Sequence, residues 1–182
     1  MLRQRHLDEM VEEYEEATAN DGLLDAALDD ERADELVSTA GDDELAGGFR
    51  AKLAVTPRPY QEEALSAWLA SVGRGVVVLP TGAGKTVLAL MAIERIKLRT
   101  LVVVPTIELL HQWRSAIIDR LGVAPAKVGV YGDGRRELRP ITIITYASAA
   151  LATTPIDGYG LLICDEAHHL PSPAYSTIVQ RG

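Results

Sequence analysis

Residues 75–93 join an apolar run to a glycine-rich turn and then to a segment of helical periodicity. Residues 75–79 read Gly-Val-Val-Val-Leu, residues 79–86 read Leu-Pro-Thr-Gly-Ala-Gly-Lys-Thr, and apolar side chains recur through 87–93. A strand, a glycine-rich loop and a helix in this order are the context of a phosphate-binding loop. The pattern therefore predicts a strand over 75–79, a helix that follows Lys85, and a phosphate site between them.

The loop offers a specific chemistry for binding a Mg-nucleotide. Gly82 and Gly84 let the backbone approach a phosphate because they carry no Cβ atom. The N–H groups at the helix start face the anion, and the helix dipole favours it. Lys85 is predicted to reach the β- and γ-phosphates, and the Thr86 hydroxyl to hold Mg²⁺. The predicted nucleotide-binding residues of the loop are Thr81, Gly82, Ala83, Gly84, Lys85 and Thr86.

One position departs from the general pattern of such loops. That pattern begins with glycine five residues before Gly84, where this chain has Leu79. The alternative interpretation of the segment is therefore a plain glycine turn ahead of a core helix. The carboxylates found further along the chain favour the phosphate site over this alternative.

The net charge of −8 is distributed unevenly over the 182 residues. Residues 1–50 hold sixteen acidic and four basic residues (−12), whereas residues 51–182 hold ten acidic and fourteen basic residues (+4). We expect 1–50 to be an acidic helical arm and linker, and 51–182 to be the catalytic unit, whose basic balance is compatible with nucleic acid. The arm is interpreted as a solubilising tail, with a docking or autoinhibitory arm that mimics nucleic acid as the alternative.

The composition also bears on location. No apolar run reaches the ~18–20 residues of a membrane span, and the first residues are followed by carboxylates rather than by the apolar core of a secretory signal. Cys164 is the only cysteine, so no intrachain disulfide can form and a reducing cytoplasm is expected. Because Cys164 lies in an apolar run, we expect a small buried side chain rather than a reactive thiol.

Strand and helix patterns alternate through the second unit. Pro59 suits the first turn of a helix that Gly73 ends, and its predicted inner face is Leu65, Trp68, Leu69 and Val72. A longer helix over 107–121 is predicted to bury Leu110, Trp113, Ile117 and Leu121. Apolar strands are expected at 100–104, 127–131, 141–145 and 160–164, with a short helix over 147–151. Strands that are apolar throughout and alternate with helices predict an α/β fold with a parallel sheet covered on both faces.

The last apolar strand ends in two carboxylates followed by Ala167-His168-His169. The carboxyl ends of strands in such a sheet are where ligands bind. Asp165 is predicted to hold Mg²⁺, and Glu166 to orient and deprotonate an attacking water; a helix N-cap is the alternative. Adjacent histidines point apart and no cysteine cluster completes four ligands, so structural zinc is not expected.

Four stretches together resemble the superfamily 2 helicases: residues 58–61, 79–86, 102–113 and 165–168. Within that superfamily the closest similarity is to the XPB-like DNA repair helicases and the related type III restriction subunits. The stretches that indicate this subgroup are Arg-Pro-Tyr-Gln at 58–61, Val-Val-Pro-Thr-Ile-Glu-Leu-Leu-His-Gln-Trp at 103–113 and Ile-Ile-Thr-Tyr at 143–146. The resemblance covers about residues 52–182 and implies a first RecA-like lobe with ATP and Mg²⁺ as cofactors.

The resemblance also implies roles for individual residues. Gln61, with Arg58 nearby, would recognise adenine, and His168 would couple the nucleotide site to a partner lobe. The residues that would contact the phosphodiester backbone of nucleic acid are Pro105, Thr106 and Thr145. Such contacts position nucleic acid without reading its sequence.

Three arginines close to these motifs are further candidates for phosphate contacts. Arg135 and Arg136 follow a Gly-Asp-Gly turn, and Arg139 lies just before the strand expected at 141–145. The alternative for all three is an exposed basic loop.

The resemblance implies that a second lobe is needed for turnover. Helicases of this superfamily hold ATP between two RecA-like lobes, and the second lobe supplies arginine fingers, which are worth roughly 10³–10⁵ in rate in other phosphoryl-transfer enzymes. This chain reaches Gly182 before a Ser/Thr-Ala-Thr motif, so we expect it to act with a second lobe in cis or in trans. In relatives the strand before that motif lies between the phosphate-loop strand and the Asp-Glu strand, so an incomplete sheet is expected.

Two other functions remain as alternatives. One is a non-catalytic nucleotide- or nucleic-acid-binding adaptor whose acidic arm contacts a partner. The other is a motor that acts on RNA or within a restriction complex. DNA is favoured by the resemblance alone, because backbone contacts do not report on the 2′-hydroxyl that separates RNA from DNA.

Overall fold

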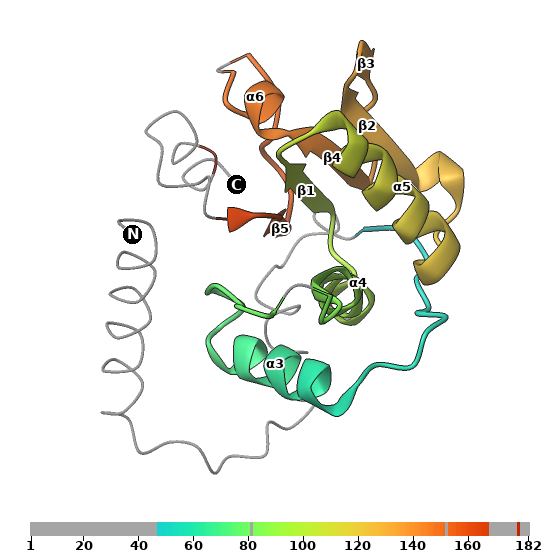
Figure 1. Cartoon of the computed structure of the whole chain (residues 1–182). Helices are drawn as coiled ribbons and strands as arrows, with labels where there is room; N and C mark the ends of the chain where they lie inside the picture. Colours follow the sequence, from blue (N-terminus) through green and yellow to red (C-terminus); the bar gives the residue numbers. More distant parts are fainter. Residues whose placement is uncertain (1–46, 81, 152, 168–177, 179–182) are drawn as a thin grey trace, which may run out of the picture.

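The computed structural model describes residues 47–80, 82–151, 153–167 and 178 (Figure 1). Residues 1–46 of the acidic arm predicted over 1–50 lie outside the described residues, as do Thr81 and His168. Within the described part, no helix is long and apolar enough to cross a membrane.

Five strands form one sheet in the order β3-β2-β4-β1-β5. Their bounds are β1 Thr100–Val104, β2 Val128–Gly132, β3 Arg135–Arg136, β4 Ile141–Thr145 and β5 Leu161–Cys164. Strands β2, β4, β1 and β5 run parallel to one another, and β3 is antiparallel to β2. The predicted mostly parallel sheet is confirmed, and the predicted strands over 100–164 agree with the observed ones to within one residue.

Strand β3 was not predicted, and the turn before it explains its formation. Asp133 and Gly134 both have positive φ, at 51° and 73°. Two successive residues of positive φ form the two-residue turn that matches the twist of antiparallel strands, and Asp-Gly is a preferred pair there. The chain after β2 therefore folds back on it, with Gly132 opposite Arg135.

The helices are α3 Pro59–Ala70, α4 Lys85–Ile96, α5 Ile107–Leu121 and α6 Tyr146–Ala149, with a 3₁₀ turn at Pro125–Lys127. The buried residues of α5 are the four predicted ones, Leu110, Trp113, Ile117 and Leu121. The expected inner face of α3 is wrong at Val72, which is 67% exposed. The physical reason is that α3 ends at Ala70 and Val72 follows with φ 57°, so Val72 has left the helical face.

Helices cover both faces of the sheet, as the unbroken apolar strands predicted. Alternate residues of a strand point to opposite faces, so the side chains of β1 divide between two apolar clusters. Val102 and Val104 pack in the cluster that includes the inner face of α5, whereas Leu101 and Val103 pack with Tyr146 of α6. The carboxyl ends of β1, β4 and β5 therefore lie between two layers. One layer contains α4 and α5, and the other contains α6.

The strand expected over 75–79 is not formed, and this prediction is wrong. Val76, Val77 and Val78 are 61%, 37% and 80% exposed, and none of the strands in the described residues pairs with them. Backbone N–H and C=O groups need a neighbouring strand to form a ladder, so an apolar run without one does not become a strand. Among the described residues the sheet ends at β5, and the incomplete sheet that the resemblance implies remains a prediction.

The segment 47–54 runs along the carboxyl ends of α4 and α5. Gly47 N–H donates to the Lys97 carbonyl (2.9 Å), and Lys52 N–H donates to the Leu121 carbonyl (2.9 Å). The last carbonyls of a helix have no partner inside it, so these bonds satisfy groups that the helices leave open. The boundary expected between residues 50 and 51 remains a prediction.

Candidate nucleotide site

The predicted phosphate loop lies at the amino end of α4. Gly84 is the N-cap of the helix with φ 81°, and Gly82 has φ 79°. A Cβ atom on Gly84 would lie 2.6 Å from Nε2 of Gln61, whereas a Cβ atom on Gly82 would have no neighbour within 4 Å. Both positions favour glycine through their left-handed backbone, and the side of the loop at Gly82 is open to a ligand.

Gln61 of α3 supports the loop through hydrogen bonds to its backbone. Its side chain is 3% exposed, and Nε2 donates to the carbonyls of Ala83 (3.1 Å) and Gly84 (3.2 Å). Oε1 of Gln61 accepts from the backbone N–H of Arg58 at 2.9 Å. In this structure both ends of the amide therefore make bonds within the protein, and the adenine contact expected of Gln61 remains a prediction.

Tyr60 supports the same loop and was missed by the sequence reasoning. Its hydroxyl donates to the Ala83 carbonyl at 2.7 Å and accepts from Nη1 of Arg58 at 3.1 Å. The only signal in the sequence is its position next to Gln61, which does not tell which way its hydroxyl points. Residues 58–61 thus act together as a support for the phosphate loop.

We expect Gln61→Glu to lower the free energy of unfolding by about 1–3 kcal/mol, the usual cost of an unsatisfied buried polar group. The change keeps the size of the side chain but replaces the donating amide with an oxygen that faces the carbonyls of Ala83 and Gly84. Urea unfolding followed by circular dichroism measures the effect. Gln112→Glu is the matched control, since Gln112 is exposed on α5. Equal stabilities of the two variants would contradict the inference that the amide of Gln61 stabilises the loop.

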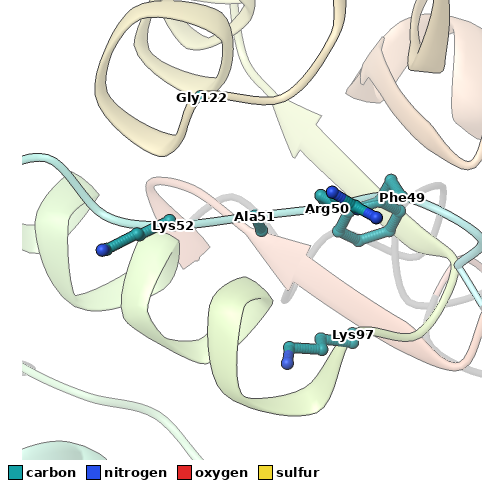
Figure 2. A pocket seen from close by; sticks show the side chains of 6 residues that line it. All are labelled: Phe49, Arg50, Ala51, Lys52, Lys97 and Gly122. Carbon is teal, nitrogen blue, oxygen red and sulfur yellow. The ribbon is translucent and has the colours of Figure 1, made fainter.

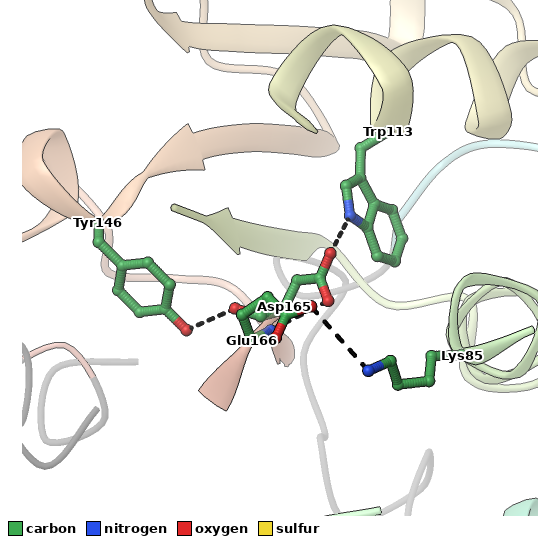
Figure 3. A network of polar contacts seen from close by, with 5 residues as sticks. All are labelled: Lys85, Trp113, Tyr146, Asp165 and Glu166. Atoms are coloured by element: carbon green, nitrogen blue, oxygen red, sulfur yellow. Dashed lines mark hydrogen bonds and ion pairs between the residues drawn. The ribbon is translucent and has the colours of Figure 1, made fainter. Parts of the chain in front are cut away.

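The carboxylates predicted at the end of the last strand lie beside the loop (Figure 3). Oε1 of Glu166 is 3.9 Å from Nζ of Lys85, with the two side chains 39% and 45% exposed. An ion pair this exposed contributes little to stability. It does show that two predicted site residues, far apart in the chain, are brought together, with Thr86 next to Lys85 at the start of α4.

Asp165 is fixed by four hydrogen bonds. Its Oδ2 accepts from Nε1 of Trp113 (2.8 Å), and its Oδ1 accepts from the backbone N–H of Glu166 (3.0 Å). Its backbone N–H donates to the Val103 carbonyl (2.9 Å), and its carbonyl accepts from the hydroxyl of Tyr146 (3.0 Å). The partners of Asp165 were missed by the sequence reasoning, which placed Trp113 only in the core face of its helix.

The neighbouring titratable groups stay protonated at neutral pH. Burial raises the pKa of the Cys164 thiol to about 11. Burial, and then the proximity of Cys164 and of the Asp165 and Glu166 carboxylates, raises the pKa of the Tyr146 hydroxyl above its ordinary range. Tyr146 therefore remains a donor. Cys164 is half-buried rather than buried as expected, because β5 is the last strand of the observed sheet.

The side chains fit a Mg-nucleotide better than a metal held by protein alone. No group of three or more His, Cys, Asp or Glu side chains among residues 47–80, 82–151 and 153–167 is arranged to hold a metal ion. Mg²⁺ takes oxygen ligands and is usually bound by one or two carboxylates together with phosphates of the nucleotide. Asp165 and Thr86 supply such oxygens, and the open amino end of α4 suits the phosphates.

The predicted nucleic-acid contacts lie at one edge of the sheet. Pro105 and Thr106 follow β1, and Thr145 ends β4 opposite Val104 of β1. Thr106 is exposed and caps α5 by accepting from the N–H of Leu109 at 3.3 Å. Thr145 is 8% exposed and caps α6, so its hydroxyl is less accessible than that of Thr106.

The three candidate arginines are separated by the fold. Arg135 and Arg136 are exposed in the β2–β3 hairpin, at the same carboxyl edge of the sheet as Thr106. The hairpin is tied to α5 by the contact of His111 Nε2 with Asp133 Oδ2 at 3.2 Å. Arg139 precedes β4 and lies at the opposite edge.

A cavity at the other end of α4 and α5 is not part of this site (Figure 2). It is lined by Phe49, Arg50, Ala51, Lys52, Lys97 and Gly122. Lys97 and Gly122 are the C-caps of α4 and α5. The carboxyl end of a helix carries partial negative charge, so the two helix dipoles disfavour a phosphate here, whereas the dipole of α4 favours one at the loop.

The fold is that of a RecA-like lobe, and the predicted phosphate loop lies at the amino end of its helix α4. The sequence profile of the family described as "Type III restriction enzyme, res subunit" matches residues 54–181, and the chain belongs to this family. The resemblance to XPB-like helicases and restriction subunits expected from the motifs is thereby confirmed, together with the RecA-like fold class.

Named relatives share this lobe. The DNA 3'-5' translocase XPB2 of Sulfurisphaera tokodaii is 48% identical over 124 residues, which are 68% of this chain and 27% of the relative. The DNA 3'-5' helicase XPB of Mycobacterium tuberculosis is 35% identical over 127 residues, 65% of this chain and 23% of the relative. This chain thus spans about a quarter of the length of these relatives.

A solved structure has the same fold. The crystal structure of the UvsW helicase from bacteriophage T4 matches with a TM-score of 0.61 over 85% of this chain and 56% of that chain. At 21% identity, this similarity supports the architecture of the lobe and nothing finer.

Proposed function

We propose that this chain is the ATP-binding first lobe of an ATP-dependent DNA helicase or translocase of the repair and transcription type. The observation that carries the proposal is the position of Glu166 at the end of β5, 3.9 Å from Lys85 of the phosphate loop. A loop lysine and a strand-end carboxylate at one helix start are what a Mg-nucleotide hydrolase needs. The names of the relatives supply the nucleic acid and the class of motor.

Within this proposal each residue of the site has a task. The loop, residues 81–86, binds the phosphates, with Lys85 at the β- and γ-phosphates. Thr86 and Asp165 hold Mg²⁺, which when bound neutralises charge on the phosphate oxygens. Glu166 orients the attacking water and accepts its proton. Lys85 and Glu166 form an ion pair in this structure, and a bound phosphate would compete with Glu166 for Lys85.

The nucleic acid would be bound at the carboxyl edge of the sheet. Pro105, Thr106 and Thr145 contact the phosphodiester backbone of DNA, so binding is independent of base sequence. A second RecA-like lobe completes the nucleotide site, and His168, outside the described residues, couples the two lobes. The single cysteine makes the reducing cytoplasm the location that we propose.

The proposal is tested by titrating the 182-residue chain with a fluorescent ATP analogue, with and without Mg²⁺, and with single-stranded DNA. We expect nucleotide binding that Mg²⁺ strengthens, and DNA binding that weakens with salt and is similar for different base sequences. An RNA of the same sequence serves as the comparison for the nucleic acid. Failure to bind Mg-nucleotide would overturn the proposal, and preference for RNA would overturn its choice of DNA.

A further inference from the structure

Asp165 is held by donors from both faces of the sheet (Figure 3). Trp113 belongs to the apolar cluster of α5, and it donates to the carboxylate. Tyr146 belongs to the cluster on the other face, and it donates to the main-chain carbonyl. The side chain and the backbone of Asp165 are thus anchored separately, each to the core of one layer.

The bond from Trp113 holds the Oδ2 side of the carboxylate and is the one that comes from a different element of the fold. The indole N–H is the only polar group of a side chain that is 3% exposed, and it can only donate. A buried indole N–H needs an acceptor, and Oδ2 of Asp165 lies 2.8 Å away. A bond of this length to a charged oxygen is among the stronger hydrogen bonds in proteins.

The hydrogen bonds leave the carboxylate able to hold a metal. Oδ1 of Asp165 receives one N–H, from Glu166, and Oδ2 receives one, from Trp113. Each carboxylate oxygen has two lone pairs, so one on each oxygen remains for a cation or its water. With one donor fixed on each oxygen, the carboxylate cannot rotate about its Cβ–Cγ bond without breaking both bonds.

We propose that Trp113 is a positioning residue for the Mg²⁺ site, acting through the carboxylate of Asp165. This inference rests on the proposed function, in which Asp165 holds Mg²⁺. Partners that orient a metal-binding side chain typically contribute 10–100-fold to metal affinity or activity. Trp113 thus has two roles, since its ring fills the core under α5 and its N–H aims the carboxylate at the end of β5.

The test is Trp113→Phe, which keeps an aromatic ring in the core and removes the donor. The Mg²⁺ concentration at half-saturation is measured for binding of a fluorescent ATP analogue, and the affinity for the same analogue is measured in excess chelator. We expect the variant to need about 10-fold more Mg²⁺ or more, with unchanged affinity in chelator. Trp68→Phe is the matched control, because Trp68 packs against the same cluster from α3, and we expect neither quantity to change.

A double-mutant cycle separates positioning from packing. In an Asp165→Ala background the carboxylate is gone, so Trp113→Phe should no longer change the Mg²⁺ requirement. A folded Trp113→Phe protein with the wild-type Mg²⁺ requirement would overturn the inference while leaving the proposed function intact. A wild-type chain that binds no Mg-nucleotide would overturn both.

A second measurement leaves Trp113 in place, in case its replacement prevents folding. The chain has two tryptophans, so Trp68→Phe leaves Trp113 as the only indole. Mn²⁺ added with nucleotide is expected to quench its fluorescence at saturation, and Asp165→Ala is expected to abolish the quenching. Unchanged fluorescence while the Mn-nucleotide is bound would contradict a metal held by the carboxylate that Trp113 contacts.

Discussion

ATP turnover at saturating single-stranded DNA is expected to rise roughly 10³–10⁵-fold when the chain is joined to a second RecA-like lobe from a close relative, the range measured for arginine fingers elsewhere. The structure brings Lys85 and Glu166 to within 3.9 Å of each other, with Asp165 next to Glu166 in the chain, and the finger is expected to come from the second lobe. Without the second lobe, the negative charge that develops on the transferred phosphoryl group is stabilised only by groups of the first lobe. A coupled assay of released phosphate, run on the short chain and on the joined chain, measures the difference.

The matched control for this experiment is Glu166→Gln in the joined chain. It keeps the size of the side chain and removes the base, so turnover should fall while Mg-ATP binding is retained. Retained binding without turnover in the unmodified joined chain would favour the non-catalytic adaptor instead. Equal turnover by the short and joined chains would contradict the requirement for a second lobe and would call for a finger within this chain, with Arg135 and Arg136 as the first to replace.

Lys85→Ala is expected to weaken Mg-ATP binding by roughly 10–100-fold. A hydrogen bond to a charged group contributes about 1.5–3 kcal/mol, and each 1.4 kcal/mol is a factor of about ten in affinity. The loss should be larger than that of any other single side chain of the loop, because Lys85 is the loop's only cation. Equilibrium binding of a fluorescent ATP analogue measures the change.

The control is Lys97→Ala at the other end of the same helix. Lys97 is the C-cap of α4 and lines the cavity of Figure 2. The substitution removes the same charge as Lys85→Ala from the same helix. Lys97, however, lies at the carboxyl end, where the helix dipole disfavours phosphate. Equal losses in the two variants would show a general effect of net charge, and the phosphate loop would then not be the binding site.

Local patterns in the sequence predicted the elements that depend on periodicity. The inner face of α5 was predicted residue by residue, because a 3.6-residue repeat determines which side chains of a helix meet a sheet. The parallel strands were predicted because a strand buried on both faces of a sheet appears in the sequence as a continuous apolar run bounded by turns. The phosphate loop and the two carboxylates were predicted as a site because their spacing and order match a known chemistry.

Features that depend on a distant partner were decided only by the tertiary structure. The run Val76-Val77-Val78 has the composition of a strand, yet it stays exposed because no described strand pairs with it. Gln61 has the same side chain as Gln112. Only the position of the loop next to α3 buries Gln61 and gives its amide the carbonyls of Ala83 and Gly84 as partners. The role of Trp113 is of the same kind.

The sequence by itself determined that the indole of Trp113 would face the core. Position 113 belongs to the apolar face that a 3.6-residue repeat defines along its helix. It did not determine that the N–H of this indole meets Asp165, fifty-two residues further along the chain. A helix repeat specifies a direction relative to its own axis, whereas a hydrogen bond requires two atoms at one point in space. That meeting exists because β5 pairs with β1 in parallel register and so delivers Asp165 beneath α5.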